Sequence, residues 1–144
     1  MNKDKQPGIN CKSVILVDSS FRRIADFPNK NLSLNYNFEY SKELQESSAN
    51  ASLSLKLIVN NEDGEMILQL GCTYVGVFCI QEDEPNMELD NFLQFNAPAI
   101  VLPYIRHFVH SVTAQAGIEP IILPPINILA LLKQSSAEAI EEKE

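Results

Sequence analysis

Two segments of the chain alternate strictly between apolar and polar residues. In residues 31–40, the apolar side chains are Leu32, Leu34, Tyr36, Phe38 and Tyr40, and each is flanked by a polar residue. The same alternation returns in residues 52–59, with Leu53, Leu55, Leu57 and Val59. A period of two is typical of β-strands with one apolar and one wet face. The polar residues 41–50 between these segments are predicted to form a connecting loop.

Two further strands are predicted around this pair. The first runs from Val14 to Phe21 and ends before Pro28, and the last covers residues 66–80. Gly71 and Gly76 interrupt the last strand and are expected to mark bulges or bends. Residues 60–64 end in Asp-Gly, a strong signal for a tight hairpin. Four strands without helices between them indicate an antiparallel meander.

After residue 85 the apolar period changes to that of a helix. Residues 90–95 are predicted to form a short turn or helix, and a long amphipathic helix follows and ends at Gly117. Its apolar side carries Val101, Ile105, Phe108, Val109, Val112 and Ala116. Pro98 fits the first turn of this helix, whereas Pro103 either kinks the helix or marks its true start.

The order of strands and then helices predicts an α+β fold with a four-stranded antiparallel sheet and two C-terminal helices on one face. The last helix is predicted to begin near Ile126 and to bury Ile128, Leu129, Leu131 and Leu132. We expect one domain over residues 13–134, a flexible N-terminus over residues 1–12 and an acidic flexible tail over residues 135–144.

Composition narrows the classes of function. The 144 residues are 45% hydrophobic and 21% charged, which is typical of a globular protein. The net charge of −8 argues against nucleic acid as a partner. It favours basic partners, or it serves to keep an oligomer soluble, and both interpretations stay open.

The sequence predicts a soluble, cytoplasmic protein without direct membrane insertion. Its three cysteines, Cys11, Cys72 and Cys79, lack CxxC spacing and suit reduced thiols. The first residues lack the apolar core of a signal peptide. The most apolar stretch, residues 118–132, is interrupted by prolines and polar residues and is not expected to span a bilayer.

Catalytic chemistry finds little support in the sequence. His107 and His110 have the spacing of a helical metal pair but lack an evident third ligand, so no metal and no cofactor are expected. Cys72 and Cys79 lie in an apolar strand, where thiols pack inertly. We therefore expect a protein that is not an enzyme. A small-molecule enzyme using the histidine pair is a weaker alternative.

The apolar residues exceed what one small domain seals in its core. Ile100, Leu102 and Tyr104 fall outside the apolar side of the long helix, and aromatic residues line neighbouring strands. A surplus of this kind indicates subunit interfaces or a groove for peptides. Self-assembly alone would make the protein an interaction scaffold that binds no client.

The helical part of the sequence resembles the SecB-type protein-export chaperone family. The motif is Pro98-Ala99-Ile100-Val101-Leu102-Pro103-Tyr104, followed by Gly117 and by Pro125-Ile126-Asn127. The resemblance implies an ATP-independent holdase that keeps unfolded preproteins competent for export by the SecA translocon. It also implies a homotetramer, a dimer of dimers with the long helices between dimers, for which the interface positions are Ile105, Phe108, Val109 and Val112. The implied peptide-binding residues are Leu34, Tyr36, Phe38, Tyr74, Phe78, Ile128, Leu131 and Leu132.

The resemblance further implies a surface for SecA, where this chain departs from the family pattern. Asp18 and Phe21 match an Asp-x-x-Phe-Glu motif, but Arg22 stands where the family has the acid. Glu62 and Glu65 keep acidic groups in the hairpin. A reversed charge at a steering surface weakens docking. A SecB-like chaperone dedicated to a toxin–antitoxin client is therefore a rival interpretation.

Overall fold

The computed structural model describes residues 8–26, 31–80 and 88–132. In this part of the chain, four strands precede two α-helices: β1 (Ile9–Arg23), β2 (Ser33–Leu44), β3 (Ser48–Asn60), β4 (Met66–Ile80), α1 (Leu89–Phe95) and α2 (Ala97–Gln115). Residues 128–132 are helical as well. The predicted α+β fold is confirmed. Residues 1–7, Pro28 and the tail 135–144 lie outside the described residues.

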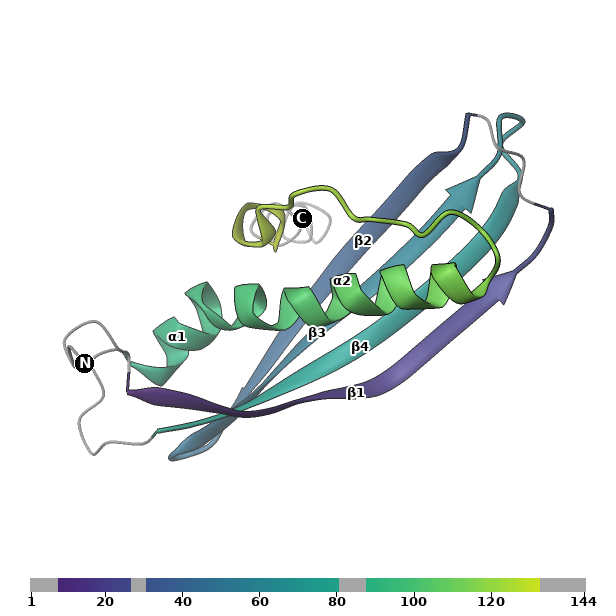
Figure 1. Ribbon diagram of the computed structural model, residues 1–144. Coiled ribbons are helices and arrows are strands. Elements are labelled where there is room, and N and C mark those ends of the chain that lie inside the picture. Colours follow the sequence, from purple (N-terminus) through teal and green to yellow (C-terminus); the bar gives the residue numbers. More distant parts are fainter. Residues whose placement is uncertain (1–7, 27–30, 81–87, 133–144) are drawn as a thin grey trace.

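The strands form one antiparallel sheet with the order β1-β4-β3-β2, and the helices lie on one of its faces (Figure 1). β3 and β4 are central, whereas β1 and β2 are the two edges. In β3 the odd-numbered residues from Ala49 to Val59 are buried beneath the helices, and the even-numbered ones point to the other face. We call these the helix side and the outer side of the sheet.

The polar segment 41–50 is not a loop, as the sequence had suggested. β2 continues to Leu44, β3 begins at Ser48, and the N–H of Gln45 donates to the carbonyl oxygen of Ser48 at 2.8 Å. The polar side chains of this hairpin are exposed, so its composition reflects solvent contact rather than irregular backbone. The first strand is also longer than predicted, because β1 begins at Ile9 rather than near residue 14.

The second hairpin has the predicted Asp-Gly turn. Gly64 has a φ of 83°, a left-handed conformation that favours glycine. The side-chain oxygen of Asn61 accepts hydrogen bonds from the N–H groups of Asp63 and Glu65, at 3.0 and 2.9 Å. The turn therefore satisfies its own backbone donors.

The glycines of β4 do not form bulges. Pairing of β4 with β3 is regular through Gly71 and Gly76, and the register shifts against β4 fall in β1, at Lys12 and Val17. A Cβ atom on Gly76 would lie 2.8 Å from the Phe78 ring and 3.1 Å from Val101 of α2. Gly76 is needed because the helix approaches the sheet closely here.

Helix α2 is continuous from Ala97 to Gln115, with Pro98 in its first turn and Pro103 inside it. Gly117, at a φ of 75°, ends it as predicted. Its buried residues, which include Val101, lie over β3 and β4 and complete the main core. A second cluster joins the sheet to α1, where the rings of Phe78 and Phe92 pack edge to face at 5.2 Å.

Candidate functional site

An extended segment, residues 117–127, leaves the end of α2 and crosses the sheet toward β2 (Figure 1). We call it the crossover. Two cavities lie between β2 and the elements that follow it. The first, of about 450 Å³, is formed by residues 32–34, Arg23 of β1 and Val59 of β3 with residues 117–121 of the crossover. The second, of about 940 Å³, is formed by residues 40–42 with the C-terminal part of α1 and residues 127–132. We call the pair the β2 groove.

Hydrogen bonds from α2 hold the crossover in place. The guanidinium of Arg106 donates to the carbonyl oxygens of Leu123 and Pro124 at 2.6 and 2.8 Å. The hydroxyl of Thr113, fully buried, donates to the carbonyl of Val109 at 2.7 Å and accepts from the N–H of Ile121 at 2.9 Å. Hydrogen bonds from a charged donor are about twice as strong as neutral ones. The wall of the β2 groove is therefore fixed by side chains outside it.

Polar contacts also fix the second cavity. The Tyr40 hydroxyl donates to the carbonyl of Leu93 at 2.5 Å, and the Lys42 ammonium contacts the Asp90 carboxylate at 2.6 Å. Burial, followed by the charge of Asp90, raises the pKa of Tyr40, so this hydroxyl remains a donor at neutral pH. The side-chain oxygen of Asn127 accepts from the N–H of Ala130 at 3.2 Å and caps the last helical turn.

Four of the eight predicted peptide-binding residues are half-buried: Leu34, Tyr36, Leu131 and Leu132. Leu34 lines the first cavity and Leu132 the second, whereas Tyr36 and Leu131 pack against the core. Tyr74 is half-buried but packs against Tyr104 of α2 at 6.0 Å, and β3 separates it from β2. The remaining three, Phe38, Phe78 and Ile128, are buried. The structure corrects their assignment to an open surface, because the crossover and α1 cover this part of the helix side.

Several apolar side chains of the groove are not among the residues predicted from the sequence. The crossover contributes Ile118 and Ile121, and the second cavity is lined by Tyr40, Phe95 and Leu129. Phe95 is 54% exposed although it is a large apolar residue. The signal was present in residues 118–126, where prolines favour an extended backbone and apolar residues recur between them.

Of the four residues of α2 that were predicted to lie at a subunit interface, two are buried within the single chain and two are half-buried. Ile105 and Val109 are fully buried against the sheet, whereas Phe108 and Val112 are half-buried on the flank of the helix. The first two are core residues of the single chain, which corrects the prediction that they meet another subunit. Tyr104, 46% exposed, is the large apolar residue that α2 does present to solvent.

Strand β1 exposes apolar side chains along an unpaired edge. Ile15, Leu16, Val17 and Phe21 are all between one-third and three-fifths exposed. Leu16 and Phe21 lie on the helix side, while Ile15 lies on the outer side. Long, apolar edge strands favour pairing with another chain.

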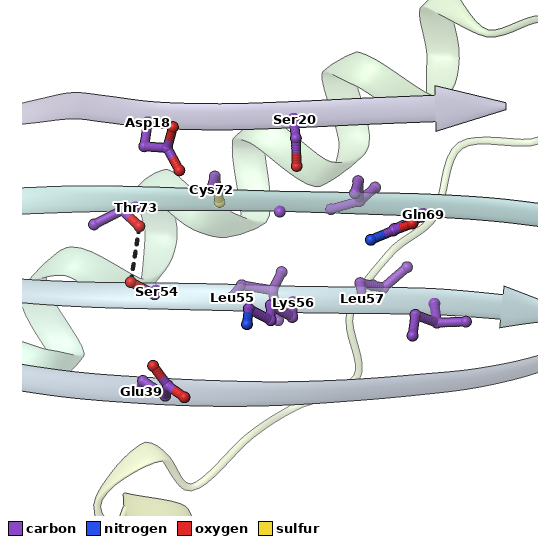
Figure 2. Close-up of a pocket in the computed structure, with 13 residues that line it drawn as sticks. Asp18, Ser20, Glu39, Ser54, Leu55, Lys56, Leu57, Gln69, Cys72 and Thr73 are labelled. Atoms are coloured by element: carbon purple, nitrogen blue, oxygen red, sulfur yellow. Dashed lines mark hydrogen bonds between the residues drawn. The ribbon is translucent and has the colours of Figure 1, made fainter.

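The outer side of the sheet is polar and carries charges of both signs. Asp18 of β1, Lys56 of β3 and Glu39 of β2, shown in Figure 2, line a depression on this side of the sheet. The hydroxyls of Ser54 and Thr73 are hydrogen-bonded at 2.8 Å on its floor.

The acids that the resemblance assigns to SecA do not form one patch. Asp18 pairs with Thr73, and Glu65 precedes Thr73 by eight residues, so the register separates Asp18 from Glu65 by roughly 26 Å along the strand. Arg22 lies between them, on the outer side like Asp18. The positive charge interrupts the acidic surface.

The candidate catalytic groups remain isolated. Burial raises the pKa of the Cys72 thiol to about 12, so it is not a thiolate at neutral pH. The ring of His107 forms a hydrogen bond with the Ser111 hydroxyl of its own helix, at 3.3 Å. Within the described ranges, no three His, Cys, Asp or Glu side chains are placed to hold a metal ion. Nor does any helix there have both the length and the apolar character to cross a bilayer.

Known proteins resemble the chain in sequence and in fold. The family model described as "Preprotein translocase subunit SecB" matches residues 4–139. The protein-export protein SecB of Dinoroseobacter shibae is 33% identical over 88 residues, which are 59% of this chain and 51% of that protein. The protein-export protein SecB of Thiobacillus denitrificans is 33% identical over 94 residues, which are 65% of this chain and 60% of that protein. The chain thus spans about half the length of the relatives that it matches.

A solved structure shares the fold. It is the SecB-like chaperone of Mycobacterium tuberculosis in complex with a ChAD peptide from the HigA1 antitoxin. The TM-score is 0.72, the sequence identity is 17%, and the match covers 83% of this chain and 91% of that one.

The hydrogen bonds of Arg106 generate a prediction about the crossover. Arg106→Met retains the apolar stem and removes both contacts to the carbonyls of residues 123 and 124. Loss of about 1.5 kcal/mol would speed amide hydrogen exchange in residues 118–126, above all at Ile121, by about tenfold. Gln115→Ala, on the same helix, is the control. Unchanged exchange in the Arg106 variant would contradict the role of this side chain.

Proposed function

The chain belongs to the SecB family, and on that premise we propose that it is an ATP-independent holdase chaperone that binds unfolded polypeptides in the β2 groove. The observation that carries the proposal is the groove itself, whose first cavity is lined by Leu34 and the crossover and whose second cavity is lined by Tyr40 and Leu132. We propose that the protein acts in the cytoplasm as a chaperone rather than as an enzyme.

Binding in this groove needs only the burial of apolar surface. Each apolar side chain of a client that leaves water contributes about 1.5–3 kcal/mol with little regard to sequence. Two cavities on one chain, repeated in an oligomer, hold a single wrapped client through high effective concentration. Weak subsites therefore suffice for strong retention of unfolded chains and for their later release.

For the client, we propose preproteins that are kept export-competent for the SecA translocon. The matched relatives are named protein-export proteins, which supports this assignment. A chaperone dedicated to a toxin–antitoxin client is the second candidate. It is favoured by Arg22 on the outer side of the sheet, and the structural neighbour from M. tuberculosis carries an antitoxin peptide.

We propose that the functional unit is a homotetramer, a dimer of dimers. The exposed edge of β1, with Leu16 and Val17, favours pairing with β1 of a second copy, because two-fold symmetric contacts use the same surface twice. The solvent-facing side of α2, with Tyr104, Phe108 and Val112, is the proposed contact between dimers.

The holdase proposal is tested by suppression of aggregation of several unrelated unfolded proteins. We expect Phe95→Ser and Leu34→Ser to weaken client affinity by about tenfold each, because each removes an apolar contact of the groove. Ile122→Ser is the matched control, since Ile122 is 76% exposed and lines neither cavity. Failure of the unaltered protein to protect any client would favour the self-assembling scaffold.

Binding of the C-terminal tail of SecA separates export from the antitoxin role. Replacing Arg22 by glutamate restores the acid of the family motif and should strengthen binding of this basic tail, most clearly at low salt. Arg22→Gln distinguishes removal of repulsion from gain of attraction and should give an intermediate affinity. Equal affinity in all three proteins would refute the steering argument.

Assembly through the β1 edge predicts a change in mass. Val17→Lys places a charge in the apolar edge and should reduce the tetramer to smaller species in sedimentation experiments. Phe108→Glu, on α2, should leave dimers. Asn10→Lys, also on β1 but away from the apolar run, serves as the control. A tetramer that persists in the Val17 variant contradicts pairing of β1 edges.

A further inference from the structure

We propose that the outer side of the sheet binds an extended partner segment in which one acidic residue lies between two basic residues, at alternating positions of the segment. The site is a depression of about 210 Å³ on the side of the sheet opposite to the helices (Figure 2). Gly71 lines it, and so do three exposed charged side chains: Asp18, Lys56 and Glu39. The inference goes beyond the holdase function and does not depend on it, because the β2 groove opens on the helix side.

Gly71 keeps this depression open. It lies in the central strand β4, where it pairs in regular register with Lys56 of β3 and Ser20 of β1, and its φ is not positive, so neither a bulge nor a turn requires glycine here. A Cβ atom at this position would lie 3.3 Å from both the carbonyl oxygen of Leu55 and the Ser20 hydroxyl. Glycine within a strand lowers its stability and often marks the close approach of another chain. The missing side chain therefore leaves room for one from a partner.

The three charges alternate in sign across the strands. Asp18 and Glu39 are at the two ends of one row of directly paired residues, which runs through Thr73 of β4 and Ser54 of β3. Three strand spacings separate these two acids, which is about 14 Å. Lys56 lies two residues from Ser54 along β3 and therefore between the two acids, as a diagonal neighbour of Glu39. The surface thus presents an acid, a base and an acid.

These charges are available to a partner. No residue in the described part of the chain forms an ion pair with any of the three, although Glu39 and Lys56 lie on adjacent strands. The neighbouring charges on the outer side are Arg22 of β1 and Glu43 of β2. The register places both roughly 12 Å or more from the nearest of the three, which exceeds the Debye length of about 8 Å at physiological salt. A partner at the depression therefore meets mainly the alternating charges.

An extended segment laid across the strands complements this alternation. In an extended chain, residues i, i+2 and i+4 point to the same side, and i and i+4 are about 14 Å apart. Basic residues at i and i+4 therefore reach Asp18 and Glu39, while an acidic residue at i+2 reaches Lys56 over the open position at Gly71. A single exposed ion pair contributes little free energy. The order of the signs accordingly selects the partner and its orientation rather than providing strong affinity.

The test uses three capped peptides of about seven residues and the full-length protein at low salt. The reference peptide has lysine at its second and sixth positions, glutamate at its fourth and threonine elsewhere. The second peptide has the same composition with glutamate at the second position and lysine at the fourth and sixth, and the third has lysine at all of these positions.

We expect the reference peptide to bind about fivefold more tightly than either of the others, because they lose or reverse one of the three contacts. Attraction to the net charge of −8 alone would instead favour the all-lysine peptide. NMR titration of the isotope-labelled protein measures the affinities and should show the largest shifts at the amides of Gly71 and Thr73.

Charge reversal at Lys56 tests the central contact. Lys56→Glu creates three acids across the strands and should reverse the order, so that the all-lysine peptide binds about tenfold more tightly than the reference. Lys12→Glu is the matched control, because it changes the net charge equally on β1 but roughly 20 Å from Asp18, and it should retain the original order. Both lysines are exposed, so neither replacement disturbs the core.

Three results would overturn the inference: tighter or equal binding of the all-lysine peptide by the unaltered protein, equal binding of the two peptides of the same composition, or an unchanged order in the Lys56 variant. A lack of binding by all three peptides at millimolar concentration would do so as well. The holdase function is read separately, because Lys56→Glu lies outside the β2 groove and should still suppress aggregation.

Discussion

Helix α2 is about 10 Å wide with its side chains, whereas four strands at about 4.8 Å spacing form a wider apolar face. One helix therefore covers about two strands, and here it lies over β3 and β4. The residues at this contact, such as Leu55 of β3 and Ile105 of α2, are fully buried. Both edges of the helix side remain partly uncovered. The β2 groove and the exposed edge of β1 both follow from this mismatch between one helix and four strands.

The two edges of the sheet differ in whether another segment of the chain covers them. Beside β2, the crossover returns across the sheet and is held above it by Arg106 and Thr113, so the apolar surface becomes a groove with two cavities. Beside β1, no described segment returns, and Leu16 and Phe21 remain exposed. A groove accommodates extended chains of many sequences, whereas an uncovered apolar edge suits a second copy of the same chain. Client binding and assembly are thus separated on opposite edges of one sheet.

The sequence predicted the regular elements and not their accessibility. Strict alternation located β2 and β3, the Asp-Gly turn located the hairpin, and Gly117 located the end of α2. β1 was predicted too short because its bulges at Lys12 and Val17 shift the parity of the pattern. Leu34 and Phe38 share one face of one strand, yet Leu34 borders a cavity and Phe38 is buried. What separates them is the path of the crossover, set by contacts between residues distant in sequence.

The position of the groove also bears on how a client would be released. The outer side of the sheet carries Asp18, one of the acids predicted to contact a partner protein, and the groove opens on the helix side. A partner on the outer side therefore does not displace the client by direct contact. The two sides meet in β2, where outward Glu39 lies between Phe38 and Tyr40. A shift of this edge strand would therefore move Glu39 on the outer side together with Tyr40, which lines the second cavity on the helix side.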